Sequence, residues 1–226
     1  MADFEPDSIK TTRIRLIYEK RGRACFVPHI VLNTLFARAA RRAGIELSST
    51  EGFSPHARMS FGPELPAGVV ALGEPVDLWL SAREKITEDK LRDFLHSVPE
   101  ALNAQMPEGF LVKKCILPAD GAPALGKECG AAHYLAWSRN ISAAELLSHM
   151  ERHYGEAILN GFVEEAALSR VSVFLANPAQ NGIGSWVKAL TADSVVAGWH
   201  DMCIVRAGLG RWNGKQMELV EEGVAF

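Results

Sequence analysis

The fold is decided by the segment RIRLIYEKRGRACFVPHIVLNTLFARAARRAG, residues 13–44. Its first six residues alternate, with Ile14, Leu16 and Tyr18 on one face, which is the period of a β-strand. After a turn, Pro28 suits the first turn of a helix. Apolar residues then recur at helical spacing up to Gly44, a favourable helix stop; they are Leu32, Leu35, Phe36, Ala39, Ala40 and Ala43. The segment therefore predicts a strand followed by an amphipathic helix.

The same alternation of strands and helices continues along the chain. Expected strands are residues 45–49, 76–80, 110–116, 132–138, 168–175, 202–207 and 216–220, and expected helices are residues 87–102, 142–153 and 185–190. Ser142 and Glu145 have the spacing of a helix N-cap. Residues 118–130 are rich in Pro, Gly and Ala and predict a linker. We expect an α+β protein of two ferredoxin-like (βαββαβ-type) units with antiparallel sheets, over residues 10–117 and 131–226.

Composition limits the class of protein. The chain has 226 residues, 48% of them hydrophobic, which is enough for one large core or two small ones. The sequence has no apolar stretch near the roughly 20 residues that cross a bilayer and no secretory leader pattern, so we expect a cytoplasmic protein without a membrane partner. The four cysteines stand far apart, without metal-ligand spacing. We expect reduced, mostly buried thiols, no metal and no cofactor.

Charge is distributed unevenly. The formal net charge is −3, yet from Lys10 to Arg58 ten Lys and Arg face three Glu, a balance of +7. From residue 61 onward, 14 basic and 21 acidic residues give −7. Such asymmetry is typical of a protein with a polyanionic partner. The alternative is that the two oppositely charged parts pair with each other.

Basic residues gather on the helix after Pro28. Arg38, Arg41 and Arg42 stand at i, i+3 and i+4, opposite the apolar stripe. Planar guanidinium groups suit phosphates, although basic residues in a last turn also stabilise a helix dipole. Six more cations strengthen the case for a basic surface; they are Arg13, Arg15, Lys20, Arg21, Arg23 and Arg58.

The segment 52–68 is the clearest candidate site, because it joins glycines and prolines to His56 and Arg58. Phe53 and Phe61 are candidates to stack on bases, or else anchor the loop in the core. The predicted RNA- or anion-binding set has nine members: Arg38, Arg41, Arg42, Gly52, Phe53, His56, Arg58, Phe61 and Gly62.

Two histidines are candidates for chemistry. His29 lies at the expected helix start, where backbone N–H groups are free, and His56 lies on the loop. Together they could cleave RNA by general acid–base catalysis, or bind a metal with Glu74 or Asp77.

Several stretches together resemble a bacterial family of radical-SAM-linked proteins. They are Phe26-Val27-Pro28-His29, Arg38 to Gly44, Ser49 to His56, Ser60 to Gly68 and Glu74-Pro75-Val76-Asp77. The resemblance is specific over residues 13–80, and it implies a domain fused to, or encoded beside, cobalamin-binding radical SAM proteins. The chain departs from the family pattern at Pro28, Val31 and Ala57, where serine, aspartate and proline are usual. It also lacks the C-x-x-x-C-x-x-C cluster motif, so the resemblance implies a companion of the radical enzyme.

Three functions follow as expectations. The first, and the favoured one, is a non-catalytic accessory module that binds structured RNA, tRNA or rRNA, and works with a radical SAM partner. The second is an RNA-processing enzyme that uses His29 and His56. The third is a module that only binds other proteins.

Overall fold

A computed structural model describes residues 11–81, 88–119, 121–165 and 168–220. It is a mixed α+β structure built on one nine-stranded sheet, mostly antiparallel. Lys10, Thr87 and Phe226, which bound predicted segments, lie outside the described residues. No helix in the described ranges is both long enough and apolar enough to span a membrane.

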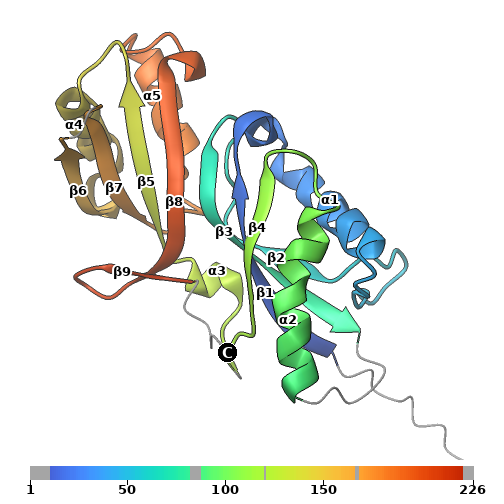
Figure 1. Ribbon diagram of the computed structural model, residues 1–226. Helices are drawn as coiled ribbons and strands as arrows, with labels where there is room; N and C mark the ends of the chain where they lie inside the picture. Colours follow the sequence, from blue (N-terminus) through green and yellow to red (C-terminus); the bar gives the residue numbers. More distant parts are fainter. Residues whose placement is uncertain (1–10, 82–87, 120, 166–167, 221–226) are drawn as a thin grey trace, which may run out of the picture.

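Four strands and two long helices lie within described residues 11–81 and 88–116. In order they are β1 (Thr11–Lys20), the 3-10 helix η1 (Gly22–Phe26), α1 (His29–Arg42), β2 (Met59–Phe61), β3 (Val70–Ser81), α2 (Glu88–Asn103) and β4 (Phe110–Ile116). β1 lies between β4 and β3, β2 pairs with β3, and all three pairings are antiparallel. α1 and α2 pack on the same side of these strands (Figure 1) and bury Phe36 and Leu102 in one core.

The second half repeats this alternation. It contains α3 (Leu125–Glu128), β5 (Ala131–Ser138), α4 (Ala143–Tyr154), η2 (Gly155–Ala157), β6 (Ile158–Glu164), β7 (Arg170–Ala176), α5 (Ile183–Ala192), η3 (Trp199–Asp201), β8 (Met202–Trp212) and β9 (Met217–Leu219). β5 lies between β8 and β7, and β6 pairs with β7, all antiparallel. A second core forms around Trp186 and Tyr134.

One short parallel contact joins the two halves into a continuous sheet (Figure 1). β3 meets β8 where Val70 pairs with Val205 and Ala71 with Arg206. The main strand order is β4-β1-β3-β8-β5-β7-β6; off this path, β2 pairs with β3 and β9 pairs with β8. Leu65, Val69 and Ala71, from the first half of the chain, belong to the second core.

Most of the expected elements are present. The strand from Arg13 and the helix after Pro28 are confirmed as β1 and α1, and Ser142 and Glu145 form the complete capping box of α4. Residues 45–49 form no strand of their own and make isolated bridges at Leu47 and Ser49. β2 and β6 were not predicted. The predicted linker contains α3, whose Leu125 is fully buried.

Candidate functional site

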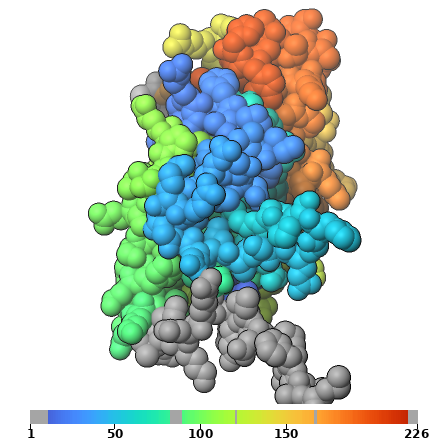
Figure 2. Space-filling view, turned by 90° about the vertical axis from the view of Figure 1, so that its right-hand side faces the viewer, coloured from blue at the N-terminus to red at the C-terminus, as the bar shows by residue number. Residues whose placement is uncertain are grey.

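Segment 48–58, here called the tip loop, is fastened to the edge of β3. The Ser48 N–H donates to the carbonyl of Trp79 (2.7 Å), the Arg58 N–H to the carbonyl of Ser48 (2.7 Å), and the Trp79 N–H to the carbonyl of Arg58 (3.2 Å). A bridge between Ser49 and Ala57 closes the loop above this anchor. Figure 2 shows the region of the tip loop, light blue to cyan, beside the end of α1 on one face of the molecule.

His56 holds the tip loop in shape. Its carbonyl accepts from the Thr50 N–H (2.8 Å), and its own N–H donates to Thr50 Oγ1 (3.2 Å). Its ring Nδ1 lies 3.1 Å from Thr50 Oγ1 and 3.3 Å from the carbonyl of Ser54. Because a carbonyl oxygen can only accept, this arrangement favours a proton on Nδ1. The exposed ring then presents Nε2 to solvent.

Two aromatic groups characterise the tip loop. Phe53 lies at its apex with a relative exposure of 110%, so its side chain packs on nothing. At the base, the guanidinium of Arg58 lies over the Trp79 ring, 4.6 Å from its centroid, in a cation–π contact.

The three arginines of α1 differ in role. Arg42 donates to the carbonyl (2.6 Å) and Oε1 (3.3 Å) of Gln105 and so ties the end of α1 to the chain after α2. Arg38 and Arg41 are exposed and have no hydrogen-bond or ion-pair partner among the described residues. They are therefore the two arginines of α1 free to meet a polyanion.

Much of the predicted basic surface is instead internal. Arg15 and Lys20 are 3% and 2% exposed. Arg13 donates to the carbonyls of Ala122 (2.8 Å) and Pro123 (2.9 Å), and Arg21 donates to Glu19 (2.5 Å). The prediction that Arg15 and Lys20 add to a basic surface is wrong, because Arg15 is buried against Asp77 and Glu128, while buried Lys20 donates to the carbonyl of Val27 (3.4 Å).

A second segment, residues 62–68, lies at the junction of the two halves and is here called the junction loop. Fully buried Arg206 of β8 donates to the carbonyls of Pro63 (2.8 Å) and Glu64 (3.3 Å). It also donates to both carboxylate oxygens of Glu74, through Nε at 2.7 Å and through Nη2. Gly62 belongs here as well, since a Cβ on it would lie 3.1 Å from the Leu209 side chain.

His29, the first residue of α1, and Phe61, the last residue of β2, contact each other. Their rings meet edge to face at 5.6 Å, and Phe61 also contacts Phe36 of the core at 5.7 Å. Burial lowers the pKa of His29, and the Glu64 carboxylate partly opposes that shift. No hydrogen bond or ring contact links His29 to His56, both of which the structure describes.

The carboxylates proposed as metal partners are already paired. Glu74 binds Arg206, and Asp77 accepts from Arg15 at 2.7 and 3.1 Å. Within the described ranges, no three His, Cys, Asp or Glu side chains gather as a possible metal site. In this structure the carboxylates of Glu74 and Asp77 are therefore both engaged by arginine side chains. Cys25 and Cys129 are buried and Cys203 is exposed, and all four cysteines are free thiols.

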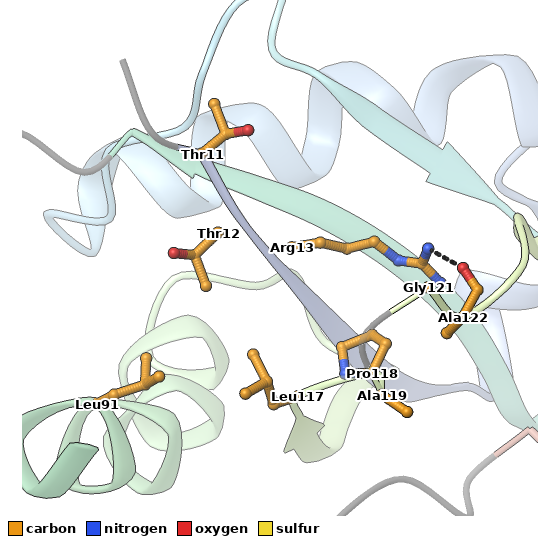
Figure 3. Close-up of a pocket in the computed structure, with 9 residues that line it drawn as sticks. All are labelled: Thr11, Thr12, Arg13, Leu91, Leu117, Pro118, Ala119, Gly121 and Ala122. Carbon is orange, nitrogen blue, oxygen red and sulfur yellow. Dashed lines mark hydrogen bonds between the residues drawn. The ribbon is translucent and has the colours of Figure 1, made fainter. Parts of the chain in front are cut away.

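The structure has two surface features that were not predicted from the sequence. A pocket of about 440 Å³ opens beside the start of β1 (Figure 3). Its nine described lining residues include one ionisable group, Arg13, whose guanidinium is already bonded to Ala122 and Pro123.

The second feature is an apolar patch at the start of α1, where Phe26, Ile30 and Val31 are 69%, 86% and 43% exposed. The sequence signal for this patch is the run of apolar residues Phe26, Val27, Ile30 and Val31, which is more than the stripe of α1 that begins at Leu32 can bury.

The fold and the site define a two-part α+β protein with a cationic helix end and a loop that is hydrogen-bonded at its base and exposes a phenylalanine. The chain belongs to the family described as "Uncharacterized protein conserved in bacteria (DUF2344)", whose model matches residues 13–162. No curated protein matches. Among solved structures, the chain is similar to the crystal structure of an unknown protein from Galdieria sulphuraria, with 11% identity and a TM-score of 0.27 over 88% of this chain and 99% of that one.

Proposed function

We propose that this protein is a non-catalytic accessory module that binds structured RNA, tRNA or rRNA, and works with a radical SAM enzyme in RNA modification or processing. Two observations together carry the proposal: Arg38 and Arg41 on α1 are exposed and unpartnered among the described residues, and the tip loop that follows α1 in the chain exposes Phe53 and Arg58. Arginine forks bind phosphates and exposed aromatic groups stack on bases, so the two together suit a nucleic acid better than a small anion.

The overall charge of −3 does not oppose this reading. Affinity for a polyanion depends on the cations that reach its phosphates. Arg15 and Arg206 are paired with carboxylates inside the protein, so neither these cations nor their partners contribute to the charge of the surface. The relevant charge is that of the exposed helix end. Each phosphate neutralised lowers log K by roughly 0.7–0.9 for every tenfold rise in salt.

The fold is consistent with such a module. Each half has the element order strand-helix-strand-strand-helix-strand, with sheet orders β4-β1-β3-β2 and β8-β5-β7-β6. We propose on this basis that each half is a ferredoxin-like unit. Function still depends on the site and not on that likeness.

A radical SAM partner is proposed from the family resemblance. The apolar patch formed by Phe26, Ile30 and Val31 is the surface that supports it, because exposed apolar patches mark protein contacts. The same patch favours the second candidate function, a module that binds only the partner protein. Copurification of the partner without RNA, abolished by Ile30→Asp, would support that alternative.

The test is fluorescence-anisotropy binding to tRNA and rRNA fragments at low and moderate salt, with the double variant Arg38→Glu/Arg41→Glu. Arg42 is left unchanged, because its bonds to Gln105 hold the helix end. The matched control is Arg139→Glu/Lys188→Glu, which changes the net charge equally at two exposed cations of the second half.

We expect salt-sensitive binding that the α1 double variant weakens, with a salt slope smaller by roughly 1.5, while the control binds nearly as the wild type does. Absence of binding at low salt, or equal loss in the control, would contradict the proposal. Loss of RNA turnover in a His29→Ala/His56→Ala variant would instead favour the enzymatic reading.

A further inference from the structure

We propose that the tip loop binds an unpaired nucleobase, with Phe53 as the stacking surface, so that the RNA ligand is recognised at a loop, a bulge or an end and not along a duplex. This inference rests on the proposed function and adds to it the class of RNA feature that is bound. It assigns recognition of bases to the tip loop and recognition of phosphates to Arg38 and Arg41.

The first support is that Phe53 is exposed on a loop whose base is closed by hydrogen bonds. Five hydrogen bonds hold the segment, among Ser48, Thr50, His56, Arg58 and Trp79. These bonds close the loop at its base, so residues 51–55 project beyond it and place Phe53 in solvent. Leaving such a large apolar group in water is unfavourable, and a ligand that covers the ring would remove that cost.

The second support is the stacked pair at the base of the loop. Trp79 covers one face of the Arg58 guanidinium at 4.6 Å, while Arg58 itself is exposed. Guanidinium planes and aromatic rings are the surfaces on which unstacked RNA bases lie. The loop therefore offers two such surfaces, Phe53 at its apex and Arg58 at its base.

The third support is the free edge of His56. With Nδ1 bound to Thr50 Oγ1 and the Ser54 carbonyl, the ring is fixed and Nε2 points to solvent. A neutral Nε2 can accept a hydrogen bond from a base edge. In a duplex the base faces are buried in the stack, and the deep major groove is closed to side chains. Phe53, Arg58 and His56 can therefore stack on and hydrogen-bond to a base only where that base is unpaired.

The experiment compares three RNA probes of equal length by anisotropy: an unstructured single strand, a perfect duplex, and a hairpin with a seven-nucleotide loop. The proteins are the wild type, Phe53→Ala, Phe53→Tyr, and Arg38→Glu/Arg41→Glu. A 2-aminopurine placed in the hairpin loop reports stacking independently, because its fluorescence is quenched when it stacks on a ring. Thermal unfolding checks the fold, which should not change, since Phe53 packs on nothing.

We expect the hairpin and the single strand to bind more tightly than the duplex. Phe53→Ala should weaken hairpin binding about 5- to 150-fold, the effect of losing one stacked base, and remove the quenching, while Phe53→Tyr restores both. Equal binding of all three probes, still dependent on Arg38 and Arg41, would overturn this inference and leave the proposed function standing. Binding of none of the probes would remove both.

Discussion

Arginine residues of this chain are either buried in ion pairs or exposed to solvent, and their place on a strand or helix decides between the two. Arg15 lies on a central strand directly opposite Asp77, where both side chains share one sheet face and become buried as a hydrogen-bonded pair. Arg38 lies on the outer face of α1, where nothing in the described structure covers it. Charged residues at alternate positions of a central strand, such as Arg13 and Arg15, thus indicate ion pairs with a neighbouring strand inside the protein.

His133 is a residue at which pH should act on stability. Its ring stacks on Phe174 (centroids 4.2 Å apart), and Nε2 lies 2.8 Å from the hydroxyl of buried Ser172. Burial lowers the pKa of His133 below 6.5; Glu164 opposes and Arg170 adds to the shift. The unfolded chain therefore binds the proton first, and the stability present above pH 6.5 is lost as pH falls toward the folded-state pKa.

We expect the free energy of unfolding of the wild type to drop more between pH 7.5 and pH 5.5 than that of His133→Gln, measured by urea denaturation. Equal drops in the two proteins would show that His133 is not the group responsible.

At the scale of elements, the strongly periodic segments were the predictable ones. β1, α1, β4 and α4 follow from alternation, helical spacing or a capping box, and each lies within one or two residues of its predicted range. β6 was missed because Asn160 and Gly161 interrupt its pattern with turn-forming residues. Gly161 is there because a Cβ would lie 3.1 Å from Leu147 of α4.

The turn before β4 depends on one glycine. Gly109 has φ +90°, and a Cβ on it would lie 2.5 Å from the Arg21 carbonyl and 2.8 Å from Ala24 Cβ. Gly214 has nearly the same φ, +94°, with open space around it. Gly109→Ala should therefore destabilise the protein by clearly more than Gly214→Ala, for which we expect about 1 kcal/mol. Thermal unfolding of the two variants measures the difference. Equal losses of stability would show that the backbone at Arg21 moves aside from the new Cβ at little cost.

The capping box of α4 allows a second element-scale test. Ser142 Oγ accepts from the Glu145 N–H at 3.2 Å, and the Glu145 carboxylate accepts from the Ser142 N–H at 3.1 Å. Ser142→Ala should cost about 1 kcal/mol of unfolding free energy in urea titration, and Ser142→Asp should cost much less. A neutral Ser142→Ala would mean that packing alone fixes the start of this helix.

At the scale of the whole molecule, buried charges link the two halves. Arg206 joins β8 to Glu74 of β3, and Arg15 of β1 donates to Glu128 of α3. Each pair connects residues more than 100 positions apart. Arg206 itself pairs with Ala71 in the short parallel contact between β3 and β8, so its ion pair with Glu74 supplements a seam that has few backbone bonds.

Arg206→Met should destabilise the protein by about 3–5 kcal/mol, because it leaves the buried Glu74 carboxylate unpaired. Adding Glu74→Leu should recover part of that loss; full recovery is not expected, since the carbonyls of Pro63 and Glu64 lose their donor. Arg170→Ala, at a partly exposed pair with Glu164, is the control and should cost at most about 1 kcal/mol. Urea denaturation measures all three, and a double variant no better than the single one would argue against an unpaired charge as the cause.

By itself the sequence determined the local elements, the α+β class and the cationic helix end, because these depend on spacings within a few residues. Only the tertiary structure decided which charges face inward, because that choice depends on partners such as Asp77 and Glu128 that are distant in sequence. It also divided one Gly/Pro-rich segment into two parts with separate roles. Residues 62–68 are held at the junction by Arg206, while residues 48–58 are fastened to Trp79 and carry Phe53 into solvent. The two parts are only three residues apart in sequence, and their long-range contacts give them separate roles.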